Sequence, residues 1–170
     1  TPQVLAGLLG AEALADTKPL RELIAKHVNR QMLREIAQEY RNGRLLMIGT
    51  TNLDAQRQVI WNMGEIAMAA ARDPKAAQLF RDVLLASSSI PMLFTPTVIE
   101  GRLFADGGIL DNFPVEPLLG LCDVILGVYA SPLSQVEASG LKSSLAVSQR
   151  AFEIGMFHAS RRKFHQVELL

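Results

Sequence analysis

The sequence contains few cysteines and histidines, and it has no net charge. Its single cysteine, Cys122, excludes an internal disulfide and a cysteine-based metal cluster. The apolar stretch LLGLCDVILGV around this residue predicts a buried thiol. The 17 basic residues balance the 17 acidic ones, so the charge gives no reason to expect a nucleic acid as partner.

Long apolar runs are also missing, and none of those present is long enough to cross a bilayer. The chain begins at Thr1 with neither an initiator Met nor a signal-peptide pattern, which suggests a cut or processed end. Its three histidines do not form a pair at the spacing of metal ligands. The sequence therefore predicts no metal and no organic cofactor, and any contact with a membrane is expected to be peripheral. It assigns neither a compartment nor an oligomeric state.

What is present is typical of a globular protein. Hydrophobic residues make up 49% of the 170 residues and charged residues 20%, so we expect one domain, residues 1–170, around a hydrophobic core. Helical patterns alternate with short apolar segments, which predicts an α/β fold, a layered sheet flanked by helices.

The helical pattern begins at an N-cap formed by Asp16 and Thr17, breaks near Asn29 and ends at Gly43. Three more helices are predicted, at 64–72, 74–86 and 141–162, the last with a stripe of Leu141, Leu145, Ser148, Phe152 and Gly155. Strands are predicted at 44–51 and 56–63 as a hairpin, on both sides of Glu100–Gly101, at 122–130 as a buried parallel strand, and at 165–170.

The most informative stretch is FADGGILDNFP, from Phe104 to Pro114. Taken alone, Asp106-Gly107-Gly108 is typical of a turn, because glycine adopts turn conformations easily and aspartate bonds its own backbone. Its surroundings favour a functional interpretation. A small-residue block with Ser87, Ser88 and Ser89 precedes it, and an Asn-x-Pro and an apolar segment follow it.

In this order of elements the sequence resembles the patatin-like phospholipases. Residues 50–64 resemble the central hairpin of that family, and the resemblance is clearest over residues 44–130. The matching motifs are Ala86-Ser87-Ser88-Ser89, Pro91, Phe94-Thr95-Pro96, Asp106-Gly107-Gly108 and Asn112-Phe113-Pro114.

The resemblance implies a lipid acyl hydrolase with a Ser-Asp dyad, acting on phospholipids or other acyl lipids. By the motif match, Asp106 would be the general base that takes the serine proton. Gly107 and Gly108 would allow a tight turn and leave room beside the carboxylate. Asn112 would support the loop by side-chain to backbone hydrogen bonds, or would instead contact the substrate.

The nucleophile that this dyad needs is missing. None of the ten serines stands in a Gly-x-Ser-x-Gly elbow, and the family's glycine-rich oxyanion loop is absent too. We therefore expect the chain to be the C-terminal portion of a patatin-like domain, an incomplete domain that is inactive alone, with the serine upstream of Thr1. Ser87, Ser88 and Ser89 are interpreted as a helix end or a loop near the site.

Two other functions stay open. Without a nucleophile, the chain would be a non-catalytic lipid-binding or interaction module with a patatin-like fold. Alternatively, Asp106 would belong to a Ser-His-Asp triad with His158 or His165. The basic residues Arg161, Arg162 and Lys163 are typical of a helix C-terminus, and anionic lipid headgroups would also attract them.

Overall fold

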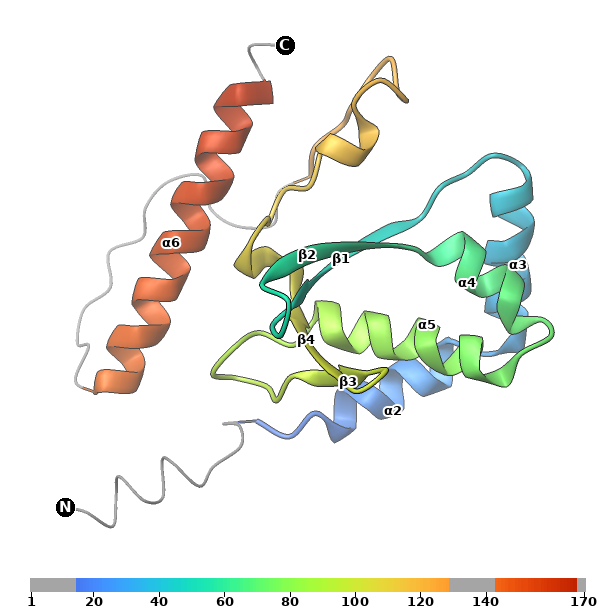
Figure 1. The fold of residues 1–170 in the computed structure, drawn as a ribbon, viewed down its shortest axis with the longest axis horizontal. Helices are drawn as coiled ribbons and strands as arrows, with labels where there is room; N and C mark the ends of the chain where they lie inside the picture. The colour runs from blue at the N-terminus through green and yellow to red at the C-terminus, as the bar shows by residue number, and fades with distance from the viewer. Residues whose placement is uncertain (1–14, 129–142, 168–170) are drawn as a thin grey trace. The chain divides into compact units, whose positions relative to one another are not determined.

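The computed structural model describes residues 15–128 and 143–167 of the chain. Residues 1–110 and 111–170 form two compact units, which are described one after the other. The first unit contains four helices and four strands in its described part (Figure 1). In chain order these are α2 (Lys18–His27), α3 (Arg30–Arg41), β1 (Met47–Asn52), β2 (Arg57–Asn62), α4 (Met63–Ala70), α5 (Pro74–Ser87), β3 (Thr97–Ile99) and β4 (Arg102–Asp106). A short 3-10 turn, η1 (Gly107–Ile109), follows β4.

The four strands form one antiparallel sheet in the order β2-β1-β4-β3. The expected hairpin and the two short strands expected around Glu100–Gly101 are confirmed. The turn between β3 and β4 uses Glu100 and Gly101 at φ angles of 51° and 76°, in the left-handed region that glycine adopts without strain. β1 is an inner strand, and it pairs with β4 through Thr50–Asp106, Thr51–Ala105 and Asn52–Phe104. The sheet thus joins residues more than fifty positions apart in the sequence.

The expected break near Asn29 is confirmed, because Asn29 is the N-cap of α3. Its side-chain oxygen accepts hydrogen bonds from the backbone N–H groups of Gln31 and Met32, at 2.9 and 3.0 Å. Gly43 follows the end of α3 with a φ of 90°, as expected for the residue that terminates a helix. Local sequence signals therefore set both ends of this helix.

The core of the first unit lies between the sheet and its helices. α5 packs against β1, β3 and β4, while α2 and α4 pack against α5 (Figure 1). This is the expected layered α/β arrangement. The buried residues of the core are Val28, Leu33, Ala37, Met63, Ala67, Phe80, Val83, Ala86, Ile99 and Phe104.

The described part of the second unit contains a 3-10 turn, η2 (Glu116–Leu118), and one long helix, α6 (Ser144–Val167). The expected helix at 141–162 is confirmed from residue 144 onwards, and Leu141 lies outside the described residues. The helix continues through 165–167, so the strand expected at 165–170 is wrong there, and residues 168–170 are not described. The expected stripe is also shifted: Ser148 and Gly155 are exposed, whereas Phe152, Met156 and Ser160 are half-buried or buried.

The buried strand expected at 122–130 is wrong over its described residues, 122–128. These residues form no strand, and Val124, Leu126 and Val128 are 83, 88 and 85% exposed. Cys122, expected to be a buried thiol, is exposed as well. An apolar run becomes a buried strand only where neighbouring strands pair with it, and this segment pairs with none of the described strands.

Two helical glycines give a test of this packing. A Cβ atom at Gly64 in α4 would lie 2.4 Å from the ring of Tyr40, whereas a Cβ atom at Gly155 in α6 meets nothing within 4 Å. We expect Gly64→Ala to lower the free energy of unfolding by about 1–3 kcal/mol through overpacking. Gly155→Ala is expected to raise it by about 0.5–1 kcal/mol, because alanine favours the helix. Urea unfolding of both variants measures the difference, and an unchanged Gly64→Ala variant would contradict the close packing of α3 on α4.

Candidate active site

Asp106 is the last residue of β4, and three backbone interactions hold it. It stands opposite Thr50 in the ladder between β1 and β4. Its N–H donates to the carbonyl of Ser89 at 3.1 Å, and its own carbonyl accepts from the hydroxyl of Thr51 at 2.9 Å. The position of the carboxylate is therefore set by the inner strand β1 and by the residues that follow α5.

Among the described residues, the carboxylate of Asp106 is bound through one of its two oxygens. Its Oδ1 atom accepts a hydrogen bond from the backbone N–H of Gly108 at 2.7 Å. Within the described part of the chain, Oδ2 accepts no hydrogen bond. Burial raises the pKa of Asp106 above its usual value, and the hydrogen bond from Gly108 opposes this effect without cancelling it. A raised pKa makes the ionised carboxylate a stronger proton acceptor.

Gly107 lies so close to the sheet that no side chain fits. A Cβ atom there would lie 2.6 Å from the carbonyl oxygen of Gly49 on β1. The expected tight turn is present as η1, closed by the Leu110 N–H, which donates to the carbonyl of Gly107 at 3.2 Å. Neither Gly107 nor Gly108 has a positive φ. Gly107 is thus required by its contact with β1, and Gly108 contributes its N–H.

Polar residues on β1 support the site, and sequence reasoning missed them. Thr50, Thr51 and Asn52 are all buried. Thr50 Oγ1 accepts a hydrogen bond from Trp61 Nε1 at 2.7 Å, Thr51 donates to Asp106, and Asn52 accepts from a backbone N–H in the turn after β1. The sequence signal for these residues is a run of three polar residues at the end of an otherwise apolar strand. Buried polar side chains need hydrogen-bond partners, so such a run indicates polar contacts at that end of the strand.

The serine block lies at the end of α5, as expected for a helix end. Ser88 and Ser89 donate from their hydroxyls to the carbonyls of Leu84 and Leu85, at 3.0 and 2.8 Å. Ser89 is buried, and its carbonyl accepts from the N–H of Asp106. These hydroxyls are used within the helix end, and the block contributes to the site through its backbone.

Asn112 begins the second unit together with Asp111. In the described part of this loop, the side-chain to backbone hydrogen bond is made by Asp111, whose Oδ1 accepts from the Phe113 N–H at 3.0 Å. Asn112 is half-buried, and its role stays a prediction. His158 lies on the exposed side of α6, and the side chain of His165 is outside the description, so the triad also stays a prediction.

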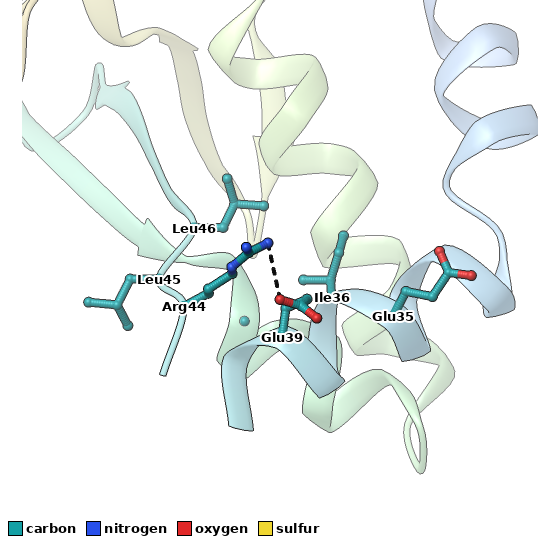
Figure 2. A pocket seen from close by; sticks show the side chains of 7 residues that line it. Glu35, Ile36, Glu39, Arg44, Leu45 and Leu46 are labelled. Carbon is teal, nitrogen blue, oxygen red and sulfur yellow. Dashed lines mark ion pairs between the residues drawn. The ribbon is translucent and has the colours of Figure 1, made fainter. Parts of the chain in front are cut away.

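A separate pocket of about 250 Å³ lies in the first unit, near the end of α3 (Figure 2). Its lining includes Ile36, Leu45 and Leu46, and an ion pair joins Arg44 to Glu39 at 3.1 Å. Neither Asp106 nor the serine block lines it. The ion pair is exposed to solvent, and no serine, threonine or cysteine lines the pocket.

Among residues 15–128 and 143–167, no group of three His, Cys, Asp or Glu side chains is placed to hold a metal ion. None of the helices in these ranges has the length and apolar character needed to cross a membrane.

Comparison with known proteins gives a family match that includes Asp106 and the residues that contact it. The family model for patatin-like phospholipases matches residues 2–119. Three curated proteins named as uncharacterized NTE family proteins, from Mycobacterium bovis and two strains of Mycobacterium tuberculosis, are each 50% identical to the chain over 36 residues. That alignment covers 21% of this chain and about a tenth of each relative.

The raised pKa of Asp106 predicts a pH-dependent effect on stability. A carboxyl group with a higher pKa in the folded state lowers stability as the pH rises above its unfolded-state pKa, about 3.9. We therefore expect Asp106→Asn to raise the free energy of unfolding at pH 7, and the gain to shrink as the pH falls towards 4. Urea unfolding at several pH values measures this, with the exposed Asp123→Asn as control. An Asp106→Asn variant that is less stable than the original protein at pH 7 would show that burial of the ionised carboxylate does not lower stability.

Proposed function

Because this chain belongs to the patatin-like phospholipase family, we propose that it is part of a lipid acyl hydrolase in which Asp106 is the general base. The nucleophile of the proposed Ser-Asp dyad is a serine upstream of Thr1. The observation that carries the proposal is the carboxylate of Asp106, which is half-buried, has a raised pKa, and is bound through Oδ1 while Oδ2 accepts no hydrogen bond from the described residues.

The proposed chemistry uses the two carboxylate oxygens differently. Oδ1 is held by the Gly108 N–H, which fixes the orientation of the group. Oδ2 takes the proton of the serine hydroxyl while the serine oxygen attacks the ester carbonyl. When the tetrahedral intermediate collapses, the protonated Asp106 returns that proton to the departing alcohol. Water then cleaves the acyl-serine by the same route and releases the carboxylic acid.

The serine is placed outside the chain because no serine within it suits the role. None of the ten serines lies in a Gly-x-Ser-x-Gly elbow, the strained turn that exposes a nucleophile. Ser88 and Ser89, which are close in sequence to the site, direct their hydroxyls to carbonyls of α5. Oxyanion donors are proposed upstream as well, so we expect the isolated chain to have no esterase activity.

The absent elbow also supports a second candidate, a lipid-binding or interaction module that keeps the fold and performs no chemistry. This candidate predicts that the native polypeptide binds phospholipid vesicles at their surface without hydrolysing them. The dyad predicts turnover of the same vesicles. Phosphatidylcholine vesicles, assayed both for sedimentation with the protein and for release of fatty acid, distinguish the two.

The decisive substitution is Asp106→Asn in the full-length polypeptide that carries this chain. Asparagine preserves the size and the oxygen that accepts from Gly108 but cannot take a proton at neutral pH. We expect kcat for a p-nitrophenyl ester to fall at least about a hundredfold, the usual contribution of a general base. Asp82→Asn on α5, where the carboxylate accepts from Gln78 at the surface, is the control and should keep full activity. Undiminished hydrolysis by Asp106→Asn would exclude the dyad.

A further inference from the structure

The loop of residues 90–96, which lies between the end of α5 and β3, is almost entirely apolar (Figure 1). Its sequence is IPMLFTP, in which Thr95 alone has a polar side chain. Ile90 is 37% exposed, and the half-buried apolar residues of the loop are Pro91, Met92, Leu93 and Phe94. In the described part of the first unit, none of these five belongs to the hydrophobic core or to the half-buried side chains that pack against it. Core packing therefore does not explain the apolar character of the 90–96 loop.

Both ends of the 90–96 loop are anchored next to the candidate base. Ser89 precedes the loop and Thr97 follows it, both are buried, and their hydroxyl oxygens are 3.4 Å apart. The Ser89 hydroxyl donates to the carbonyl of Leu85, so the Thr97 hydroxyl is the donor to Ser89. The carbonyl of Ser89 accepts from the Asp106 N–H at 3.1 Å. The loop thus starts one residue after a backbone partner of Asp106, and all these contacts lie within the first unit.

Backbone hydrogen bonds also fix the shape of the loop itself. The N–H groups of Leu93 and Phe94 both donate to the carbonyl of Ile90, at 3.2 and 3.0 Å. The carbonyl of Leu93 accepts from the Ala15 N–H at 2.9 Å. The apolar side chains of the loop therefore stand on an ordered turn, as a ligand contact requires.

Met92 occupies a strained position in this turn. Its φ is 70°, in the left-handed region where residues other than glycine lose free energy to steric contacts. Strained residues persist where the surrounding structure holds them, and they cluster at sites that bind ligands. A methionine side chain is flexible and adapts to irregular apolar surfaces. An apolar side chain held here at the cost of backbone strain is consistent with an apolar ligand.

We propose that the 90–96 loop contacts the acyl chain of the lipid substrate, and that Met92 and Leu93 determine the preference for chain length. This inference rests on the proposed function, in which the ester carbonyl reacts beside Asp106. The acyl chain is bonded to that carbonyl, so it needs apolar protein surface close to the base. Binding sites for apolar ligands are lined mainly by apolar side chains, and the 90–96 loop has this composition at this place.

The test compares two esters in the full-length polypeptide that carries this chain. We measure kcat/KM for p-nitrophenyl decanoate and p-nitrophenyl butyrate, both below the concentration at which they form micelles. Met92→Gln and Leu93→Asn nearly preserve side-chain size and make the surface polar. Burial of one methylene favours binding by about fourfold, so we expect the ratio of decanoate to butyrate kcat/KM to fall at least about fivefold in each variant.

Two further variants separate contact with the acyl chain from a general effect on the fold. Leu93→Met keeps an apolar side chain of similar size and should keep the ratio within about twofold of the original. Val98→Gln is the matched control, because Val98 is apolar and 61% exposed on β3 but lies outside the loop, and its ratio should be unchanged. Ile90→Thr, at the most exposed of the loop's apolar side chains, provides a milder test if Met92→Gln or Leu93→Asn does not fold.

An unchanged ratio in both Met92→Gln and Leu93→Asn would overturn the inference, even if both esters react more slowly, because an equal loss indicates a structural role for the loop. A ratio that falls as far in Val98→Gln would overturn it as well. The failure of the proposed function is recognised separately, because Asp106→Asn would then retain full hydrolysis of both esters. An inactive Asp106→Asn beside unchanged ratios in the loop variants would remove the acyl-chain contact alone and leave the dyad in place.

Discussion

The pairing of β4 with β1 is the constraint on which the arrangement around Asp106 depends. Because Asp106 stands opposite Thr50, its N–H reaches Ser89 and its carbonyl reaches Thr51. A shift of one residue in this register would turn the carboxylate to the other side of the sheet. Gly107 reinforces the register, since its contact with Gly49 leaves no space for a side chain.

The pairing of β4 with β1 places polar side chains of an inner strand next to Asp106. Thr50, Thr51 and Asn52 are buried where apolar residues would be easier to accommodate, and each needs a hydrogen-bond partner. Their partners are a tryptophan N–H, the carbonyl of Asp106 and a turn N–H. The strand therefore gives the site a rigid and fully bonded support, of the kind that holds a reactive group in one orientation.

Local signals made much of the first unit predictable from sequence. A break was expected near Asn29, which caps α3, and the two short segments at 44–51 and 56–63 indicated a hairpin. Asp106 was identified from its motif, but its partners were not, because Thr51 lies 55 positions away and no local pattern records that contact. The segment with Cys122 failed for a related reason: its apolar run indicates strand propensity, while burial depends on neighbouring strands that local sequence does not specify.

The end of a strand suits the role of general base that is proposed for Asp106. In the middle of the sheet, full burial would keep the acid neutral, and a neutral carboxyl group is no base. On an open surface the pKa would stay low, and the ionised group would be a weak proton acceptor. At the end of β4, one oxygen of Asp106 is held by Gly108 and the group is half-buried. Partial burial raises the pKa of Asp106 and also leaves its carboxylate accessible. Neither the interior of the sheet nor the open surface provides both conditions.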